Sequence, residues 1–263
     1  MPVVVGPTAV GKSRVAFDLA RRIQGEIIVA DSRQVYRRLE IATNKPLPAE
    51  RAVVRYHCID LADPEQTFNV HQWLQVASAA VRAVAAPIVE GGTNLYVDAL
   101  ADGLTLTGVA PRPERRLELE RLSTSELAAS VRTLDPGVEL DFRNRVRLIR
   151  AIEVLEVAGA PLHRLRSRLD PGWEAVRIGL TLPMARLEER IRERCQAQLG
   201  RGLIEEAQAA LEAGVLAGSQ ALSGTGYAEA VGFIAGRVSR EDLPQLMFTN
   251  NRRLAKRQLT WLR

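Results

Sequence analysis

The sequence of 263 residues contains only two cysteines, Cys58 and Cys195, which lie far apart in the chain. Neither belongs to a C-x-x-C pair or to a Cys/His cluster, and this excludes the usual patterns of zinc-binding sites. No disulfide pairing can be argued from their positions. We therefore expect a protein of a reducing compartment, the cytoplasm.

Long apolar runs are also missing. No run approaches the about 18 residues that a membrane-spanning helix needs. No charged leader with a cleavage site precedes the first apolar segment, so we expect no signal peptide and no membrane partner. The sequence shows no internal repeat and no low-complexity segment. Its hydrophobic content of 46% and its length suit an α/β domain with a smaller appendage.

Acidic residues are fewer than basic ones, 31 against 36, so the formal net charge is +5. This excess favours an anionic partner, although many basic proteins bind no nucleic acid. The places where the cations gather are therefore more informative than their number.

The most specific motif lies at the N-terminus. Residues 6–13 read Gly-Pro-Thr-Ala-Val-Gly-Lys-Ser and fit the pattern G-x-x-x-x-G-K-[ST] of a phosphate-binding loop. Glycines let consecutive backbone N–H groups turn inward around phosphate oxygens, and the following helix adds the positive end of its dipole. In such a loop Lys12 supplies a mobile charge and Ser13 a magnesium ligand.

The flanks of this motif support the same interpretation. Residues 2–5 are apolar and predict a buried strand, whereas residues 14–23 predict an amphipathic helix with Val15, Leu19 and Ile23 facing inward. The same letters could form a glycine turn with a surface lysine. A strand before the loop and a helix after it favour the phosphate-binding loop.

Two further apolar segments, each of strand length, are followed by polar residues that we expect at one edge of a sheet. Residues 26–30 lead to Asp31, and residues 87–89 lead to Glu90-Gly91-Gly92-Thr93. Sites form at the carboxyl ends of strands in open α/β sheets. Asp31 could cap a turn or act as a general base beside the loop, and Thr93 places a hydroxyl at the same edge. A phosphate-loop hydrolase would have a metal-binding aspartate after Val89. The sequence has a glutamate and two glycines there instead.

The amino-acid composition of the sequence changes near Gly103. Residues 103–113 resemble a linker rich in Gly, Thr and Pro, and the following residues up to 172 are helical and rich in arginine. We therefore predict an α/β fold with a P-loop-type, mostly parallel sheet flanked by helices, and an inserted all-helical subdomain. The core would span residues 1–103 and 174–263, and the insertion residues 104–173.

Basic residues are expected to gather on three helices. The helix in the insertion carries Arg143, Arg147 and Arg150. A second helix, after a strand at residues 176–182, carries Arg186, Arg190 and Arg194, and the final helix carries the cations of residues 251–263. Such stripes are usually solvated faces. In the final helix, however, Gln258 and Trp261 lie among the cations, a pattern more typical of a nucleic-acid surface.

Together these segments resemble the tRNA dimethylallyltransferase family, also called tRNA isopentenyltransferases. The resemblance runs nearly end to end and rests on residues 6–13, 31–36, 91–96, 150–154 and 255–263. It implies transfer of a dimethylallyl group from dimethylallyl diphosphate to the exocyclic N6 amine of the adenosine immediately 3′ of the anticodon. It also implies binding of the tRNA anticodon stem-loop and Mg²⁺, and we expect a monomer.

The resemblance assigns roles residue by residue. It makes Asp31 the general base and places Thr93 close to the reacting centre. The residues that would bind the diphosphate are Gly6, Thr8, Ala9, Gly11, Lys12, Ser13 and Arg194, with Mg²⁺ on Ser13. The residues that would contact tRNA are Asp31, Ser32, Arg33, Gln34, Thr93, Arg116, Arg147, Arg150, Gly226, Tyr227, Lys256, Arg257, Gln258 and Arg263. The phosphate loop would then hold a leaving diphosphate, which explains why a hydrolase-type acid is missing after Val89.

Two other classes share part of this pattern. A P-loop small-molecule kinase would have the phosphate loop and the arginine-bearing helix, and an RNA-binding ATPase would hydrolyse ATP in response to RNA. Neither class predicts Asp31 and Thr93 together with a basic C-terminal helix. Ala42 and Ala228 depart from the family's pattern, in which a glycine and a basic residue are expected.

Overall fold

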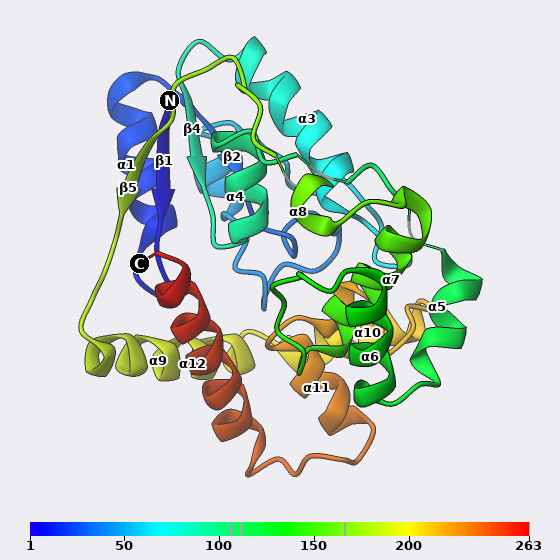
Figure 1. The fold of residues 1–263 in the computed structure, drawn as a ribbon. Helices are drawn as coiled ribbons and strands as arrows, with labels where there is room; N and C mark the ends of the chain where they lie inside the picture. Colours follow the sequence, from blue (N-terminus) through cyan, green and yellow to red (C-terminus); the bar gives the residue numbers. More distant parts are fainter. Residues whose placement is uncertain (106, 111, 166, 263) are drawn as a thin grey trace. The chain divides into compact units, whose positions relative to one another are not determined.

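The computed structural model describes residues 1–105, 107–110, 112–165 and 167–262. It consists of two compact units, one formed by Met1–Ala101 with Gly172–Arg263 and the other by Asp102–Pro171. We call them the sheet unit and the insertion unit. Figure 1 shows the course of the chain through both. The boundaries predicted from the sequence were 103/104 and 173/174.

The sheet unit is built on five parallel strands. They are β1 (Pro2–Val5), β2 (Glu26–Val29), β3 (Tyr56–His57), β4 (Pro87–Glu90) and β5 (Val176–Gly179), and their order in the sheet is β3-β2-β4-β1-β5. Every pair of neighbouring strands is parallel. The predicted P-loop-type parallel sheet is therefore confirmed. Strand β4 lies between the strand that carries the phosphate loop and the strand that leads to Asp31.

Alternate residues of β1 enter different apolar clusters because successive side chains of a strand point to opposite faces. Val3 and Val5 belong to a large cluster that includes helices α3 (Val70–Ala83) and α4 (Asn94–Ala101). Val4 belongs to a second cluster, together with helix α1 (Lys12–Ile23). Helices thus cover both faces of the sheet.

The inward face of α1 was predicted wrongly for two of its three residues. Val15 and Ile23 are 38% and 44% exposed, whereas Ala16, Phe17 and Ala20 are buried. The third, Leu19, is partly buried and packs against the second cluster, as predicted. Two alanines beside one phenylalanine let the helix approach the sheet closely. Val15 and Ile23 are therefore left outside the contact.

Five further elements of the sheet unit extend the large cluster. They are α9 (Met184–Gly200), α10 (Leu203–Glu212), the 3₁₀ turn η1 (Ala221–Ser223), α11 (Tyr227–Ile234) and α12 (Leu243–Trp261). The short helix α2 (Pro48–Arg51) has no buried residue. Trp73 is fully buried, stacks on Tyr96 with ring centroids 4.5 Å apart and donates its indole N–H to the carbonyl oxygen of Val29. This side chain therefore belongs to the core of the sheet unit. No helix in the described part of the chain has both the length and the apolar character needed to cross a bilayer.

The insertion unit is helical, as predicted. It contains α5 (Pro113–Glu120), α6 (Thr124–Leu134), α7 (Arg145–Ala158) and α8 (Leu162–Leu165). Its own apolar cluster is centred on Leu127, Leu148 and Ile152. Ser123 and Asn144 cap the N-termini of α6 and α7 through side-chain oxygens that accept backbone N–H bonds.

Candidate active site

A cavity of about 530 Å³ opens at the carboxyl ends of the strands of the sheet unit. We call it the phosphate cavity. Its wall includes the phosphate loop, the residues that follow β2 and β4, the turn before α11 and one face of α12. This is the edge at which open parallel sheets place their ligands.

The phosphate loop joins β1 to α1 in the expected conformation. Ala9 and Gly11 have φ angles of 65° and 106°, in the left-handed region that turns consecutive N–H groups toward a common centre. The Lys12 ammonium donates to the carbonyl oxygens of Gly6 and Pro7, 3.0 Å from each. Burial lowers the pKa of this ammonium, and the nearby carboxylates of Glu90 and Asp31 oppose that shift.

Asp31 and Thr93 come from neighbouring strand ends and both line the phosphate cavity. The Asp31 carboxylate accepts a bond of 2.8 Å from the Arg33 N–H, and the Thr93 hydroxyl oxygen accepts one of 2.9 Å from the Ser32 N–H. A Cβ at Gly91 would lie 2.1 Å from the carbonyl oxygen of Ala30. Only glycine lets the two turns approach this closely.

Arg194 reaches the phosphate loop from α9. Its guanidinium donates to the Thr8 hydroxyl at 2.7 Å and to the Asn251 side-chain oxygen at 2.9 Å. Its Nε is buried without a hydrogen-bond partner in the structure, and burial lowers the pKa of the group. Of the predicted stripe on α9, Arg190 instead donates to the Val10 carbonyl oxygen, and Arg186 pairs with Glu189.

After Val89, where a phosphate-loop hydrolase would have an aspartate, the chain has Glu90. Glu90 is 3% exposed, lines the phosphate cavity and accepts a hydrogen bond of 3.3 Å from the Ser13 hydroxyl. The structure thus places a carboxylate beside the phosphate loop, on a residue to which the sequence analysis assigned no role. Glutamate reaches further than aspartate, so a glutamate at the strand end meets the first turn of α1.

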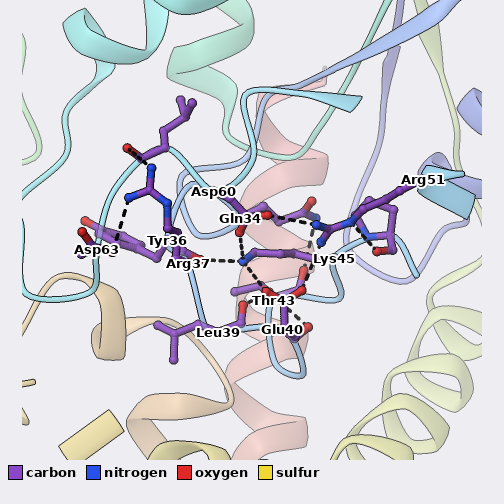
Figure 2. Close-up of polar contacts among 12 residues, drawn as sticks. Gln34, Tyr36, Arg37, Leu39, Glu40, Thr43, Lys45, Arg51, Asp60 and Asp63 are labelled. Atoms are coloured by element: carbon purple, nitrogen blue, oxygen red, sulfur yellow. Dashed lines mark hydrogen bonds and ion pairs between the residues drawn. The ribbon is translucent and has the colours of Figure 1, made fainter. Parts of the chain in front are cut away.

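Gln34 is held by a loop that a buried lysine anchors (Figure 2). The Gln34 amide donates to the carbonyl oxygen of Thr43 at 3.2 Å, while its Oε1 is buried and has no partner in the described part of the chain. Lys45 lies two residues after Thr43, and its ammonium binds Glu40 at 2.8 Å and Asp60 at 2.5 Å. We call this group, together with Arg51, the Lys45 network.

Each carboxylate of the Lys45 network binds both of its cations. Arg51 binds the second oxygen of each carboxylate, Glu40 at 3.1 Å and Asp60 at 3.0 Å. The Lys45 ammonium also donates to the Tyr36 carbonyl oxygen at 2.6 Å. Two cations and two anions thus fix the segment that runs from Gln34 to Lys45. Sequence reasoning missed this network because its members are separated by loops with no recognisable spacing.

Other predicted tRNA contacts of the sheet unit are engaged within it. The Arg33 guanidinium donates to the Gln220 carbonyl oxygen, and the Tyr227 hydroxyl donates to Glu206. The Gln258 amide joins the Thr8 N–H to the Gly92 carbonyl oxygen, with bonds of 2.7 Å and 2.9 Å. These side chains shape the cavity wall, which includes Arg33, Tyr227 and Gln258.

The remaining predicted contacts divide into exposed and engaged residues. Gly226 has a φ of 98°, and its N–H donates to Glu229. Lys256 and Arg257 are exposed on α12, and Arg257 also lines the phosphate cavity. Arg263 lies outside the described residues.

In the insertion unit the three predicted arginines behave differently. The Glu153 carboxylate is fully buried and binds Arg116 at 2.7 Å and Arg150 at 3.5 Å. Arg147 is exposed on α7. Arg143, predicted to share its stripe, precedes the helix and is 94% exposed.

Comparisons with known proteins agree along the whole chain. The sequence pattern of the family described as IPP transferase matches residues 34–263. The tRNA dimethylallyltransferase of Roseiflexus sp. (strain RS-1) is 39% identical over 270 residues, which cover 99% of this chain and 88% of that protein. That of Streptococcus sanguinis (strain SK36) is 37% identical over 268 residues, with coverages of 99% and 88%.

Two solved structures have the same fold. The full-length tRNA isopentenylpyrophosphate transferase from Bacillus halodurans superposes with a TM-score of 0.73 at 33% identity, covering 99% of this chain and 86% of that one. A eukaryotic dimethylallyltransferase acting on tRNA superposes with a TM-score of 0.78 at 23% identity, with coverages of 100% and 69%. At the latter identity the likeness concerns the fold alone.

Proposed function

Since this chain belongs to the IPP transferase family, we propose that it transfers the dimethylallyl group of dimethylallyl diphosphate to the N6 amine of the adenosine immediately 3′ of a tRNA anticodon. It is a prenyltransferase that acts on tRNA. One observation carries the proposal: a carboxylate, Asp31, and a phosphate-binding loop line the same cavity. The relatives do not favour the alternative, a small-molecule kinase.

Asp31 acts as the general base. The lone pair of an adenine amine is delocalised into the ring, so the amine is a poor nucleophile. A carboxylate that accepts an N6 proton while the new N–C bond forms contributes about 10²–10⁴-fold to the rate. Thr93 holds the Ser32 N–H and thereby fixes the turn that presents Asp31.

The phosphate loop stabilises the leaving group. As the bond between C1 of the dimethylallyl group and the diphosphate oxygen breaks, the electron pair goes to that oxygen and its negative charge grows. Donors already in place stabilise such charge without reorganisation. Lys12, Arg194 and the backbone N–H groups of the loop are these donors, and the Nε of Arg194 has no hydrogen-bond partner among the described residues.

The residues of the cavity fit Mg²⁺, which prefers oxygen ligands and binds substrate phosphates with few protein ligands. Ser13 lies on the cavity wall in the first turn of α1, and its hydroxyl supplies such an oxygen. Bound there, the cation would neutralise part of the charge on the departing diphosphate.

The adenosine leaves the anticodon loop to reach Asp31, and this base flipping costs a few kcal/mol. Contacts to the tRNA backbone offset that cost. We assign them to the exposed cations Lys256 and Arg257 of the sheet unit and, separately, to Arg147 of the insertion unit. The protein binds the anticodon stem-loop as a monomer and works in the cytoplasm.

A double-label assay tests this function. The protein is incubated with Mg²⁺, an anticodon stem-loop and dimethylallyl diphosphate that carries ¹⁴C in the dimethylallyl group or ³²P in the diphosphate. We expect only ¹⁴C in the RNA and ³²P in free diphosphate. Entry of ³²P into an acceptor would instead identify a phosphotransferase.

Two aspartate variants locate the base. Asp31→Asn should lower the rate of transfer by about 10²–10⁴-fold. Asp18→Asn serves as the control, because Asp18 lies on the exposed side of α1 and pairs with Arg14. Equal rates for Asp31→Asn and the wild-type protein would refute the assignment of Asp31.

A further inference from the structure

Glu90 occupies a central position at the phosphate cavity. It ends β4 and is in register with Val4 of β1 on one side and Val29 of β2 on the other. The phosphate loop follows β1, and Asp31 follows β2 two residues later. The Glu90 carboxylate therefore lies between the two functional segments of the cavity.

This carboxylate is buried and forms no ion pair with the residues that the structure describes. Among the described residues, no nitrogen of a lysine, arginine or histidine lies within 4.0 Å of its oxygens, and its side chain is hydrogen-bonded to the Ser13 hydroxyl. Burial raises the pKa of Glu90, Lys12 acts against that shift and Asp31 adds to it. Glu153, buried in the insertion unit, has two arginines instead.

A bound diphosphate would repel the buried carboxylate of Glu90. The phosphate loop would bring several negative charges to the cavity that Glu90 lines, and the low polarity of a buried site strengthens their repulsion. A divalent cation between the carboxylate and the phosphate oxygens removes the conflict. Mg²⁺ is commonly held in this way, by one or two protein oxygens together with substrate phosphates.

The position of Glu90 matches such a role. Phosphate-loop enzymes hold their cation with the loop Ser or Thr and with an acid from a second strand. Here the loop residue is Ser13, and the acid at the end of the adjacent strand touches it at 3.3 Å. The described residues contain no group of three or more His, Cys, Asp or Glu side chains suited to a metal. The site would therefore need the substrate's oxygens to be complete.

We propose that Glu90 and Ser13 form the protein half of a divalent-cation site that the oxygens of the bound diphosphate complete. The proposal rests on the proposed function in one respect, namely that a diphosphate occupies the phosphate loop. Glu90 then couples the two ligands: the cation makes diphosphate binding favourable, and the diphosphate makes cation binding favourable.

Mn²⁺ and inorganic pyrophosphate test this coupling without tRNA or turnover. Free Mn²⁺ is followed by its EPR signal, with and without pyrophosphate, for the wild-type protein, Glu90→Gln and Asp31→Asn. Glu90→Gln keeps the shape and an oxygen for Ser13 but removes the charge. Asp31→Asn removes a charge from the same cavity without touching Ser13, and is the matched control.

We expect the wild-type protein to bind Mn²⁺ tightly only with pyrophosphate present. Glu90→Gln should weaken that Mn²⁺ binding at least about 10-fold and should bind pyrophosphate more tightly than the wild-type protein when no metal is added. Asp31→Asn should keep the coupling. Ser13→Ala, which removes the other ligand, should weaken Mn²⁺ binding in the same direction and guards against a folding defect of Glu90→Gln.

Three results would overturn the proposal, and they differ in what else they overturn. If the wild-type protein binds Mn²⁺ and pyrophosphate but Glu90→Gln binds both equally well, the cation site is wrong while the donor assignment stands. If the wild-type protein binds no pyrophosphate with or without metal, the donor assignment fails together with the cation site. An equal loss of coupling in Asp31→Asn would also reject ligation by Glu90, because it would indicate a general effect of charge.

Discussion

The sheet unit contains two lysines in enclosed surroundings, and they differ in their partners. Lys45 has a fully buried side chain with two carboxylates, one at 2.8 Å and one at 2.5 Å. Among the described residues, Lys12 has no carboxylate within 4.0 Å and donates to two backbone carbonyl oxygens instead. Removing one partner of a buried ion pair leaves the other charge uncompensated and destabilises the fold. A buried charge without an ion-pair partner can instead interact with a ligand of opposite charge.

The same contrast applies to the neighbours of each lysine. Around Lys45, Arg51 binds the remaining oxygens of both carboxylates. Around Lys12, Glu90 has no counter-ion within ion-pair distance in the described residues, and the buried Nε of Arg194 is without a partner. Three groups with unmet interactions therefore surround one cavity. This concentration distinguishes a binding site from a structural network.

Of the variants that test this contrast between the lysines, Lys12→Met should have the largest effect on the transfer rate. Loss of one preorganised donor to a developing negative charge lowers kcat by about 10²–10³-fold. The free energy of unfolding should be unchanged or higher, because the variant no longer buries an ammonium without a counter-ion. Single-turnover transfer rates and urea unfolding measure the two quantities. If the free energy of unfolding of Lys12→Met fell by as much as its activation free energy rose, Lys12 would be a structural residue, as Lys45 is.

Lys45→Met should show the opposite behaviour. Removing one member of a buried ion pair costs about 3–5 kcal/mol, and we expect the lower end, since Glu40 and Asp60 are 44% and 30% exposed. Urea unfolding measures this loss.

Arg37→Met provides a control for Lys45→Met in the same region (Figure 2). Arg37 and Asp63 form a pair whose side chains are 47% and 44% exposed, so the change should cost less than about 1 kcal/mol. Equal losses in the two variants would show that burial of Lys45 does not matter.

The smallest effect is expected from an exposed cation. Lys256→Ala should weaken tRNA binding less than 10-fold, roughly equally for all tRNAs, and reduce the salt dependence of binding by about one counter-ion. Filter binding at several salt concentrations measures this slope. Arg22→Ala on α1, outside the proposed RNA surface, should leave the slope unchanged.

The features predicted correctly from the sequence are those encoded by neighbouring residues. The phosphate loop, its strand and its helix are contiguous, so a single motif with its flanks indicated all three. The helical insertion was recognised from its composition. The face of α1 was not, because Phe17 between small residues packs better than the Val15 and Ile23 face.

The features that the sequence did not reveal depend on residues brought together only by folding. Glu90 and Ser13 are 77 positions apart and lie on different elements, so the sequence did not reveal that their side chains meet. Arg194 and Asn251 meet across two helices, 57 positions apart. A glutamate at the end of an apolar strand beside the phosphate-loop strand was the one signal that could have identified the acid.

The contrast between Lys12 and Lys45 is tested most directly by thermal unfolding of the wild-type protein, Lys12→Met and Lys45→Met. Each is unfolded with and without Mg²⁺ and pyrophosphate. Ligand at about 100 times its Kd should raise the wild-type Tm by roughly 5–10 °C. Lys45→Met should start from a lower Tm and show the same rise, whereas Lys12→Met should start from the wild-type Tm or above and show little rise. A full rise in Lys12→Met together with none in Lys45→Met would contradict the account.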